Sequence, residues 1–297
     1  MVGIIGIGAS EYGARAAAHY YRTIGVRAFS ISASEIITTK TSEADFYLVI
    51  SESGRSSEVL RAVAILKSEN NITASKMALI TNFPDSPLGS QIPNILPLNC
   101  GEDSAVYTIG FTATLQALGI IGEYWSGTKS DWSKLSTQVA EVITKFKPIA
   151  QTLVPVFDDL ALVDVIGTGI AIASAGEGAL LLREVAHLRT AFHETYNYLH
   201  GPMEPLESNV GAIVIGSGRE IELATYLTGL KCPVLLLTQN KVSIDSATTY
   251  QLPIGENPMT SAIFEIVGVQ LVAYHLAKSR GLKVDGFRYK QEDTKIV

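Results

Sequence analysis

Apolar residues occur along the chain in short β-rich runs that alternate with longer stretches of helical spacing. The runs are nearly continuous in apolar character, which suits strands that are covered on both faces. They lie at residues 2–8, 26–32, 46–51, 77–81 and 95–98 in the first half, and at 162–167, 212–215, 234–238 and 250–253 in the second. Such alternation predicts βαβ units around a mostly parallel sheet.

The two halves of the chain follow the same plan. Short motifs recur in the same order: Gly6-x-Gly8 as Gly167-x-Gly169, residues 51–54 as 216–218, and 79–81 as 236–238. Each half also ends in a long apolar helical stretch, at 105–125 and at 261–277. A duplicated domain keeps order and spacing in this way. We therefore predict an α/β protein with two flavodoxin-like domains, each with three layers, helix, parallel sheet and helix; a coincidence of α/β periodicity is the alternative.

A polar stretch at 126–136 and an amphipathic run at 138–156 separate the halves. Proline cannot donate a helical hydrogen bond, so Pro148 and Pro155 are expected to bend or end this helix. The resulting division is a first domain at 1–135, a helical connection at 136–155, and a second domain with a C-terminal tail at 156–297.

The composition indicates a soluble chain with a sizeable core. Hydrophobic residues make up 47% of the 297 positions, and 29 acidic against 23 basic residues give a net charge of -6. This charge disfavours nucleic acid and anionic lipid. We find no signal-peptide pattern and no apolar stretch of about 18 residues, so no membrane association is expected. The two cysteines, Cys100 and Cys232, have no metal-binding spacing and fit a reducing cytoplasm.

A glycine-rich turn after the first strand raises the question of a dinucleotide site. Gly6-x-Gly8 precedes a helix, but the next glycine, Gly13, comes one position too late for the G-x-G-x-x-G fingerprint. The second strand ends in Ser32, where that fingerprint expects an acid for the ribose. We interpret the turn as structural and expect neither NAD nor another cofactor.

A serine-rich turn at residues 51–57, Ser-Glu-Ser-Gly-Arg-Ser-Ser, follows a buried strand directly and leads into a helical pattern. A helix start offers backbone N–H groups and the positive end of the dipole, and hydroxyl groups add neutral donors. The turn therefore predicts a phosphate site, although serine is also a common N-cap residue. Ser10 and the pair Ser34 and Glu35 follow strands on the same edge and could line the same crevice.

Glu184 lies on an apolar helical stripe, with Leu180 and Leu181 one turn before it and Leu188 one turn after it. A carboxyl group that faces packing is costly unless it is paired or protonated, and general acids and bases arise at such positions. A structural buried ion pair is the alternative.

Three histidines follow Glu184. His200 lies in a loop before Gly201-Pro202, a pair that fixes a turn. His187 and His193 are assigned to the helix of Glu184, together with Arg189. Spacing alone does not choose among these histidines.

Taken in order along the chain, these motifs resemble the sugar isomerase (SIS) domain family in its tandem form. The matching pieces are Gly8-Ala9-Ser10, Ala33-Ser34-Glu35, the serine turn, the run 178–184 and His200-Gly201-Pro202. The resemblance implies that Ser51, Ser53 and Ser56 bind a sugar phosphate, with Glu52 in place of the usual glutamine and Ser10 beside them. It also implies that Glu184 is the base that moves a proton between C1 and C2, and that no metal is needed.

The resemblance further implies that His200 opens the sugar ring. In this family that histidine reaches the site from a neighbouring subunit, so a homodimer is expected.

The chain departs from the family at several positions. The family's lysine near the C-terminus falls at about Glu292, where Lys290 or Lys295 could substitute. Ala9 replaces a threonine of the first loop, and Leu181 replaces a lysine one turn before the base. The family's helices before the first strand, and a glutaminase domain, are not found in this sequence.

Two classes of function remain open from the sequence. The first is a phosphosugar aldose–ketose isomerase, or a related deaminase or deglycase that acts on a phosphorylated amino sugar or sugar–amine adduct. The second is a non-catalytic phosphosugar sensor, which would keep the serine turn without needing Glu184. A dehydrogenase is the third choice, and a transcriptional regulator is disfavoured because no basic patch precedes the first domain.

Overall fold

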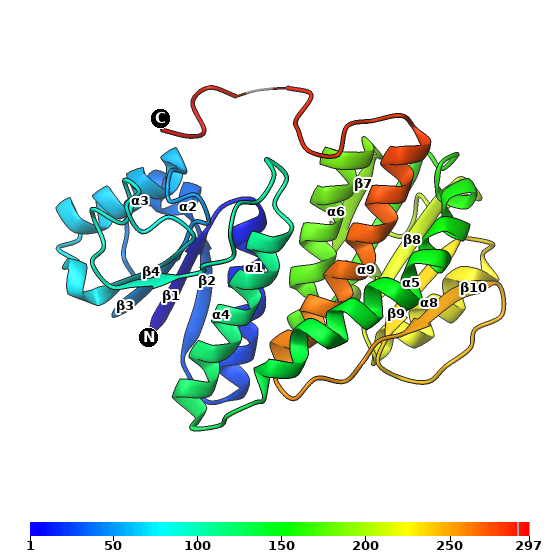
Figure 1. Ribbon diagram of the computed structural model, residues 1–297, viewed down its shortest axis with the longest axis horizontal. Coiled ribbons are helices and arrows are strands. Elements are labelled where there is room, and N and C mark those ends of the chain that lie inside the picture. The colour runs from blue at the N-terminus through cyan, green and yellow to red at the C-terminus, as the bar shows by residue number, and fades with distance from the viewer. Residues whose placement is uncertain (290, 297) are drawn as a thin grey trace. The chain divides into compact units, whose positions relative to one another are not determined.

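The computed structural model, which describes residues 1–289 and 291–296, contains two compact units (Figure 1). The first unit comprises Met1–Lys129 together with the C-terminal residues from Tyr289 on, and the second comprises Ser130–Arg288. In this division the helical connection belongs to the second unit, and the C-terminal tail belongs to the first unit. The division predicted from the sequence differs in two ways: it treats the connection as a separate segment, and it places the tail in the second domain.

The first unit is built on one parallel sheet. Its strands are β1 (Val2–Gly6), β2 (Ala28–Ser32), β3 (Phe46–Ile50), β4 (Met77–Thr81) and β5 (Ile95–Pro97), in the spatial order β2-β1-β3-β4-β5. All five were predicted from the sequence. The order reverses between β1 and β3, and in open α/β sheets ligands bind outside the carboxyl ends of the strands at such a point. The serine turn follows β3 directly and therefore lies at this position.

Helices cover both faces of the first sheet. The helix α1 (Ala9–Thr23) packs with α4 (Ile109–Ser126), and α2 (Ala33–Thr39) packs with α3 (Ser57–Ser68). Val59, Ala62, Val63 and Leu66 of α3 are fully buried at helical spacing. They share one hydrophobic cluster with Ile5, Val49 and Ile36 of the sheet and α2. This packing holds α3, and with it the helix start that carries the serine turn.

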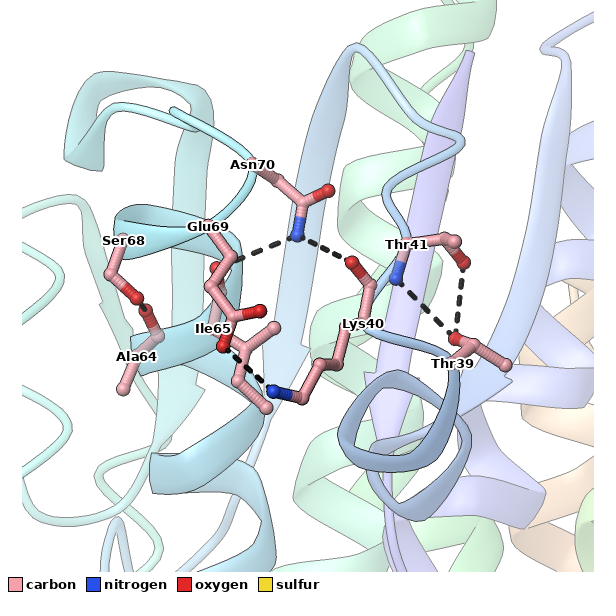
Figure 2. A network of polar contacts seen from close by, with 8 residues as sticks. All are labelled: Thr39, Lys40, Thr41, Ala64, Ile65, Ser68, Glu69 and Asn70. Atoms are coloured by element: carbon pink, nitrogen blue, oxygen red, sulfur yellow. Dashed lines mark hydrogen bonds and ion pairs between the residues drawn. The ribbon is translucent and has the colours of Figure 1, made fainter.

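A network of polar contacts joins the C-terminal ends of α2 and α3 (Figure 2). The Asn70 side-chain amide donates to the Lys40 carbonyl at 3.1 Å, and the Lys40 ammonium lies 3.4 Å from the Glu69 carboxylate. Lys40 ends α2 in the left-handed conformation, with φ of 56°. The ion pair is exposed, so its contribution to stability is below about 1 kcal/mol.

The second unit repeats the topology of the first. Its strands are β6 (Leu162–Gly167), β7 (Thr190–His193), β8 (Val210–Ile215), β9 (Val234–Thr238) and β10 (Ala247–Gln251), in the order β10-β9-β8-β6-β7. Numbered from β6, this is the strand order of the first sheet, and all pairings in both sheets are parallel. The predicted fold class, two α/β domains of flavodoxin-like topology, is confirmed.

The helices of the second unit also form two layers. One layer contains α5 (Leu135–Phe157), α6 (Ile172–Ala186) and α9 (Pro258–Ser279), with α9 packed against the other two. On the other face, Tyr198 of α7 (Thr195–Tyr198) and Leu223 of α8 (Arg219–Gly229) share a cluster with strand residues. Short 3-10 helices lie at Ala74–Lys76, Trp132–Lys134 and Gly169–Ala171.

The helix α9 is long and apolar enough to cross a membrane by length and composition. However, 72% of its most apolar window is buried inside the structure. The helix lies between α5 and α6 (Figure 1). Its hydrophobicity is therefore that of a core helix.

Two local features differ from what the sequence led us to expect. Pro148 and Pro155 were expected to bend or end the helical connection, but α5 ends at neither of them and continues through both to Phe157, because Val142, Phe146 and Ala150 hold it against the core. The helix of Glu184 ends at Ala186, where His187 adopts the left-handed conformation with φ of 51°. Leu188 N–H then donates to the Leu182 carbonyl, a common helix ending.

The early end of α6 relocates the residues that follow it. His193 belongs to the strand β7 and Arg189 to the loop before it, so neither lies on the helix of Glu184. The strand β7 has only four residues and is only partly buried. It therefore shows neither the apolar run nor the apolar–polar alternation from which a strand can be predicted.

Candidate functional site

The serine turn is a tight loop whose shape depends on Gly54. This residue has φ of 62°, and an added Cβ would lie 1.9 Å from the Ser86 hydroxyl oxygen. Gly54 N–H donates to the Ser51 carbonyl at 3.0 Å, and the Gly54 carbonyl accepts from Leu88 N–H at 3.1 Å. The Thr81 hydroxyl donates to the Glu52 carbonyl at 3.0 Å. The turn is thus fixed by the end of β4 and the loop after it.

The hydroxyl groups of the turn lie close together at the start of α3. Ser51 is 2% exposed, and its Oγ lies 3.3 Å from the Oγ of Ser56. Ser56 is the N-cap of α3 without a capping hydrogen bond from its own side chain. Ser53 Oγ accepts from Arg55 N–H at 3.3 Å. Since the Ser56 hydroxyl is not used for capping, this group of hydroxyls can donate to an anion at the helix start.

The C-terminal tail lies along the serine turn. Ser57 N–H donates to the Thr294 carbonyl and Ile296 N–H to the Arg55 carbonyl, both at 3.0 Å, and Ser56 and Lys295 form an antiparallel bridge. The Lys295 ammonium donates to the Tyr107 hydroxyl at 2.7 Å. No sequence signal could reveal a contact between residues 188 positions apart. Lys290, the other lysine considered, lies outside the described residues.

A pocket of about 450 Å³ opens beside the turn. Glu52, Ser53, Arg55, Phe83, Glu102, Asp103, Ser104, Ala105, Tyr107 and Lys295 line it. Glu52 is only 7% exposed. Burial raises the pKa of its carboxyl group above the ordinary value, although Tyr107, Asn82 and the Lys295 charge oppose this shift. Of the predicted phosphate ligands, Ser53 and Glu52 line this pocket, whereas Ser51 and Ser56 are not among its lining residues. Ser10, Ser34 and Glu35 lie at the starts of α1 and α2 and do not line it either.

Glu184 is partly buried near the end of α6, and a second carboxyl group accompanies it. Glu177, seven positions earlier and thus on the same side of the helix, is 2% exposed. Burial first, and then the Glu184 charge, raise the pKa of Glu177 well above its ordinary value. Glu177 was not predicted from the sequence. Its spacing of seven positions from Glu184, which places both carboxyl groups on one side of a helix, is the signal that could have identified it. A neutral acid beside a carboxylate suits a site that handles protons.

A third acid, Glu265 of α9, faces α6. It is 6% exposed and accepts a hydrogen bond from the Ser174 hydroxyl. Burial raises its pKa from 4.5 to about 7, the Ser174 hydrogen bond opposes this shift, and the Glu220 charge adds to it.

The raised pKa of Glu265 predicts that stability falls as the pH rises. Between pH 4.5 and 7 the folded state binds this proton more tightly than the unfolded state does, so the contribution of Glu265 to the free energy of unfolding is fully present below pH 4.5. That contribution should decrease by on the order of 3 kcal/mol as the pH rises from 4.5 through 7. Thermal unfolding from pH 5 to 8 should show a smaller decrease for Glu265→Gln than for wild type, with Glu177 supplying the remaining slope. Identical pH profiles would exclude this role of Glu265.

His200 lies on an exposed turn after α7. Its N–H donates to the Asn197 carbonyl at 3.0 Å, and Glu194 caps the helix through Asn197 N–H at 2.9 Å. The Tyr198 hydroxyl donates to the buried carboxylate of Asp164 at 2.8 Å, and His193 lies 3.3 Å from the other oxygen of Asp164. These contacts anchor α7 and therefore the turn that presents the His200 ring.

The second unit carries a counterpart of the serine turn, at Gly216-Ser217-Gly218 before α8. Here a side chain of the protein itself occupies the helix start. Glu220, 3% exposed, accepts from Gly218 N–H at 3.2 Å and from the Thr195 hydroxyl at 2.6 Å. The Ser217 hydroxyl contacts Thr238 and Gln239. The second turn is thus satisfied internally, whereas Ser53 of the first turn lines a pocket.

Metal ligands do not cluster in the part of the chain that the structure describes: no group of three or more His, Cys, Asp or Glu residues could hold an ion there.

Comparison with known proteins identifies the family of both units. The family model of the SIS domain matches residues 2–121 and 162–280, one segment in each unit. The chain belongs to the SIS domain family.

Curated relatives and solved structures extend the match. Glutamine–fructose-6-phosphate aminotransferase (isomerizing) of Bradyrhizobium diazoefficiens is 28% identical over 262 residues, which cover 81% of this chain and 42% of that protein. The chain spans about half the length of the curated relatives it matches. The C-terminal domain of glucosamine-fructose-6-phosphate aminotransferase from Francisella tularensis superposes with a TM-score of 0.84 at 21% identity, covering 96% of this chain and 85% of that one.

A second solved structure has the same fold. Glucosamine-6-phosphate deaminase from Thermotoga maritima superposes with a TM-score of 0.80 at 22% identity, covering 100% of this chain and 90% of that one. The SIS fold of this chain is therefore of the type found in phosphosugar isomerases and deaminases.

Proposed function

We propose that this chain is an enzyme that moves a proton between C1 and C2 of a phosphorylated sugar or amino sugar, as an aldose–ketose isomerase or an isomerising deaminase. The observation that carries the proposal is the serine turn: the hydroxyls of Ser51 and Ser56 lie together at the start of α3, Ser53 lines a pocket, and the turn lies where the strand order reverses. In this proposal Ser51, Ser53 and Ser56 bind the phosphate.

Glu184 is the proposed base. A base at C2 must accept a proton and return it to C1, so its carboxyl group must hold the proton between the two steps. The neighbouring carboxyl group of Glu177 is buried and its pKa is raised, which supports proton handling at this end of α6. His200 is the proposed acid and base for ring opening. Its exposed position supports donation to the site of a neighbouring subunit in a homodimer.

Proton NMR in heavy water tests the proposal. The purified protein is incubated with the 6-phosphates of fructose, glucose, tagatose, galactose, mannose and glucosamine. We expect deuterium to enter C1 or C2 of at least one sugar, with conversion to its isomer or with release of ammonia. No exchange with any phosphosugar would contradict the proposed catalysis.

A non-catalytic phosphosugar sensor is the second candidate. Leu181 and Glu292 stand where the family has lysines, and the Thr294 carbonyl occupies the Ser57 N–H. A sensor would broaden the signals of a phosphosugar in the same NMR experiment without exchange or conversion.

A further inference from the structure

The strand β6 carries a buried carboxyl group in its middle. Asp164 is 3% exposed, and its neighbours in register are Ala191 on β7 and Ala212 on β8. These small side chains leave room beside the carboxylate for the ring of Tyr198, which is fully buried. A charge at such a position is costly, and replacing a buried charged group by an apolar residue is often neutral or stabilising. The stability of the unit alone therefore does not explain a carboxyl group here.

Two side chains converge on this carboxylate. The Tyr198 hydroxyl donates to Oδ2 of Asp164 at 2.8 Å, and Nε2 of His193 lies 3.3 Å from Oδ1. Burial, and then the charge of Asp164, raise the pKa of the Tyr198 hydroxyl above its ordinary value, so this group stays protonated as a donor. The centres of the Tyr198 and His193 rings lie 5.1 Å apart. The end of β7 and the helix α7 are thus held at one point of β6.

The helix α7 needs such contacts because it has only four residues. A helix of one turn is not stable through its own hydrogen bonds. At its start, the Thr195 hydroxyl donates to Glu220 at 2.6 Å, and at its end Tyr198 donates to Asp164. The hydrogen bond to Asp164 therefore fixes the end of α7 that is nearer to His200.

The turn that carries His200 is built on this end of α7. Met203 N–H donates to the Tyr198 carbonyl at 3.3 Å, and His200 N–H donates to the Asn197 carbonyl at 3.0 Å. Both acceptors belong to α7, so the turn moves with the helix. Because His200 is exposed, the backbone of the turn decides where its ring lies. A small shift of Tyr198 therefore displaces the imidazole.

We propose that Asp164 and Tyr198 are positioning residues for His200: the carboxylate fixes Tyr198 through its hydroxyl, and Tyr198 fixes the turn that holds the imidazole in the geometry for opening the sugar ring. This inference rests on the proposed function, in which His200 is the acid and base for ring opening, and adds two residues that do not touch the sugar. A displacement of about 1 Å of a group that acts on the substrate can lower the rate by about 10²-fold. An open-chain substrate needs no ring opening, so this step can be measured apart from the proton transfer.

Deuterium exchange with a matched pair of ketoses makes that separation. The first is the ketose 6-phosphate that wild type exchanges most rapidly, and the second is its 5-deoxy analogue, which has no C5 hydroxyl and therefore stays open-chain. The readout is the ratio of kcat/KM for exchange with the ring-forming ketose to kcat/KM with the analogue. Tyr198→Phe, which keeps the ring and removes the hydroxyl, should lower this ratio about tenfold relative to wild type.

Three further variants complete the series. Asp164→Leu removes the acceptor and should lower the ratio as Tyr198→Phe does. Asp164→Asn keeps an acceptor for the Tyr198 hydroxyl and should stay within about threefold of wild type. Tyr124→Phe, at an 86% exposed tyrosine of α4, is the matched control and should equal wild type. A partly unfolded variant loses both rates in proportion, so the ratio still reports on ring opening.

The outcomes separate this inference from the proposed function. If His200→Ala lowers the ratio and Tyr198→Phe does not, Asp164 and Tyr198 have no positioning role, while the proposed function stands. If His200→Ala leaves the ratio unchanged, His200 does not open the ring and the inference is overturned. If wild type exchanges deuterium into no ketose 6-phosphate and into no open-chain analogue, the proposed function itself fails.

Discussion

Glu184→Gln is expected to reduce turnover by about 10³-fold and to leave phosphosugar affinity nearly unchanged. The substitution preserves the shape of the side chain but removes the group that accepts the proton from C2, and general acid–base catalysis contributes roughly 10²-fold to 10⁴-fold. Deuterium exchange at C1 and C2 measures the loss, and ligand titration measures the affinity. Glu141→Gln, at an exposed ion pair on α5, is the control and should behave as wild type.

The proposed cross-subunit role of His200 adds a second readout to this variant. If the site combines Glu184 of one subunit with the histidine of its neighbour, Glu184→Gln and His200→Ala homodimers are both inactive. A mixed dimer then contains one intact site and one doubly altered site. After random exchange of subunits in a two-fold symmetric dimer, an equal mixture should recover about a quarter of wild-type activity. Turnover that persists in Glu184→Gln would remove Glu184 from the mechanism, and no recovery in the mixture would place His200 within its own subunit.

Gly54→Ala is expected to lower the free energy of unfolding by about 3 kcal/mol or more and to abolish phosphosugar binding. Two costs combine: an alanine at φ of 62° is strained, and its Cβ would overlap the buried Ser86 hydroxyl. Relief of this overlap must move the turn and therefore the hydroxyls of Ser51 and Ser56. Chemical denaturation and ligand titration measure the two effects.

Two further variants separate these costs. Gly127 also has positive φ, at 71°, but an added Cβ there meets nothing within 4 Å, so Gly127→Ala should cost about 1 kcal/mol and leave binding intact. Replacing Ser86 by glycine in the Gly54→Ala background should recover part of the lost stability. If Gly54→Ala is as stable as Gly127→Ala, the overlap with the Ser86 hydroxyl does not lower the free energy of unfolding, and this part of the prediction is wrong.

The fold was accessible from the sequence because its strands are short apolar runs whose order repeats. The strands at 77–81, 162–167 and 234–238 were predicted to the residue, since each is bounded by polar or turn residues. The strand β7 was missed because it is partly exposed and follows α6 after only three residues. The prolines of α5 do not end the helix for a different reason: packing against α9 outweighs the local preference of proline.

Only part of the candidate site could be predicted from the sequence. The hydroxyls of the serine turn are adjacent along the chain, so their clustering follows from the turn itself. In contrast, the contacts of Tyr107 and Lys295 depend on a tail that returns to the first unit. The position of the Glu52 side chain depends on its close approach to Gly110 of α4. Contacts of this kind depend on the tertiary fold and leave no periodicity to detect.

Glu220 bears on how a duplicated domain can diverge. The two turns stand at the same place in the two sheets, and a single acidic residue in the first turn of α8 makes the second turn a closed, self-sufficient structure. The carboxyl groups of Glu177, Glu184 and Glu265 lie on α6 and α9 of that same unit. If the first turn holds the phosphate as proposed, the two copies of the domain divide the work: one binds the anion, and the other supplies the acids.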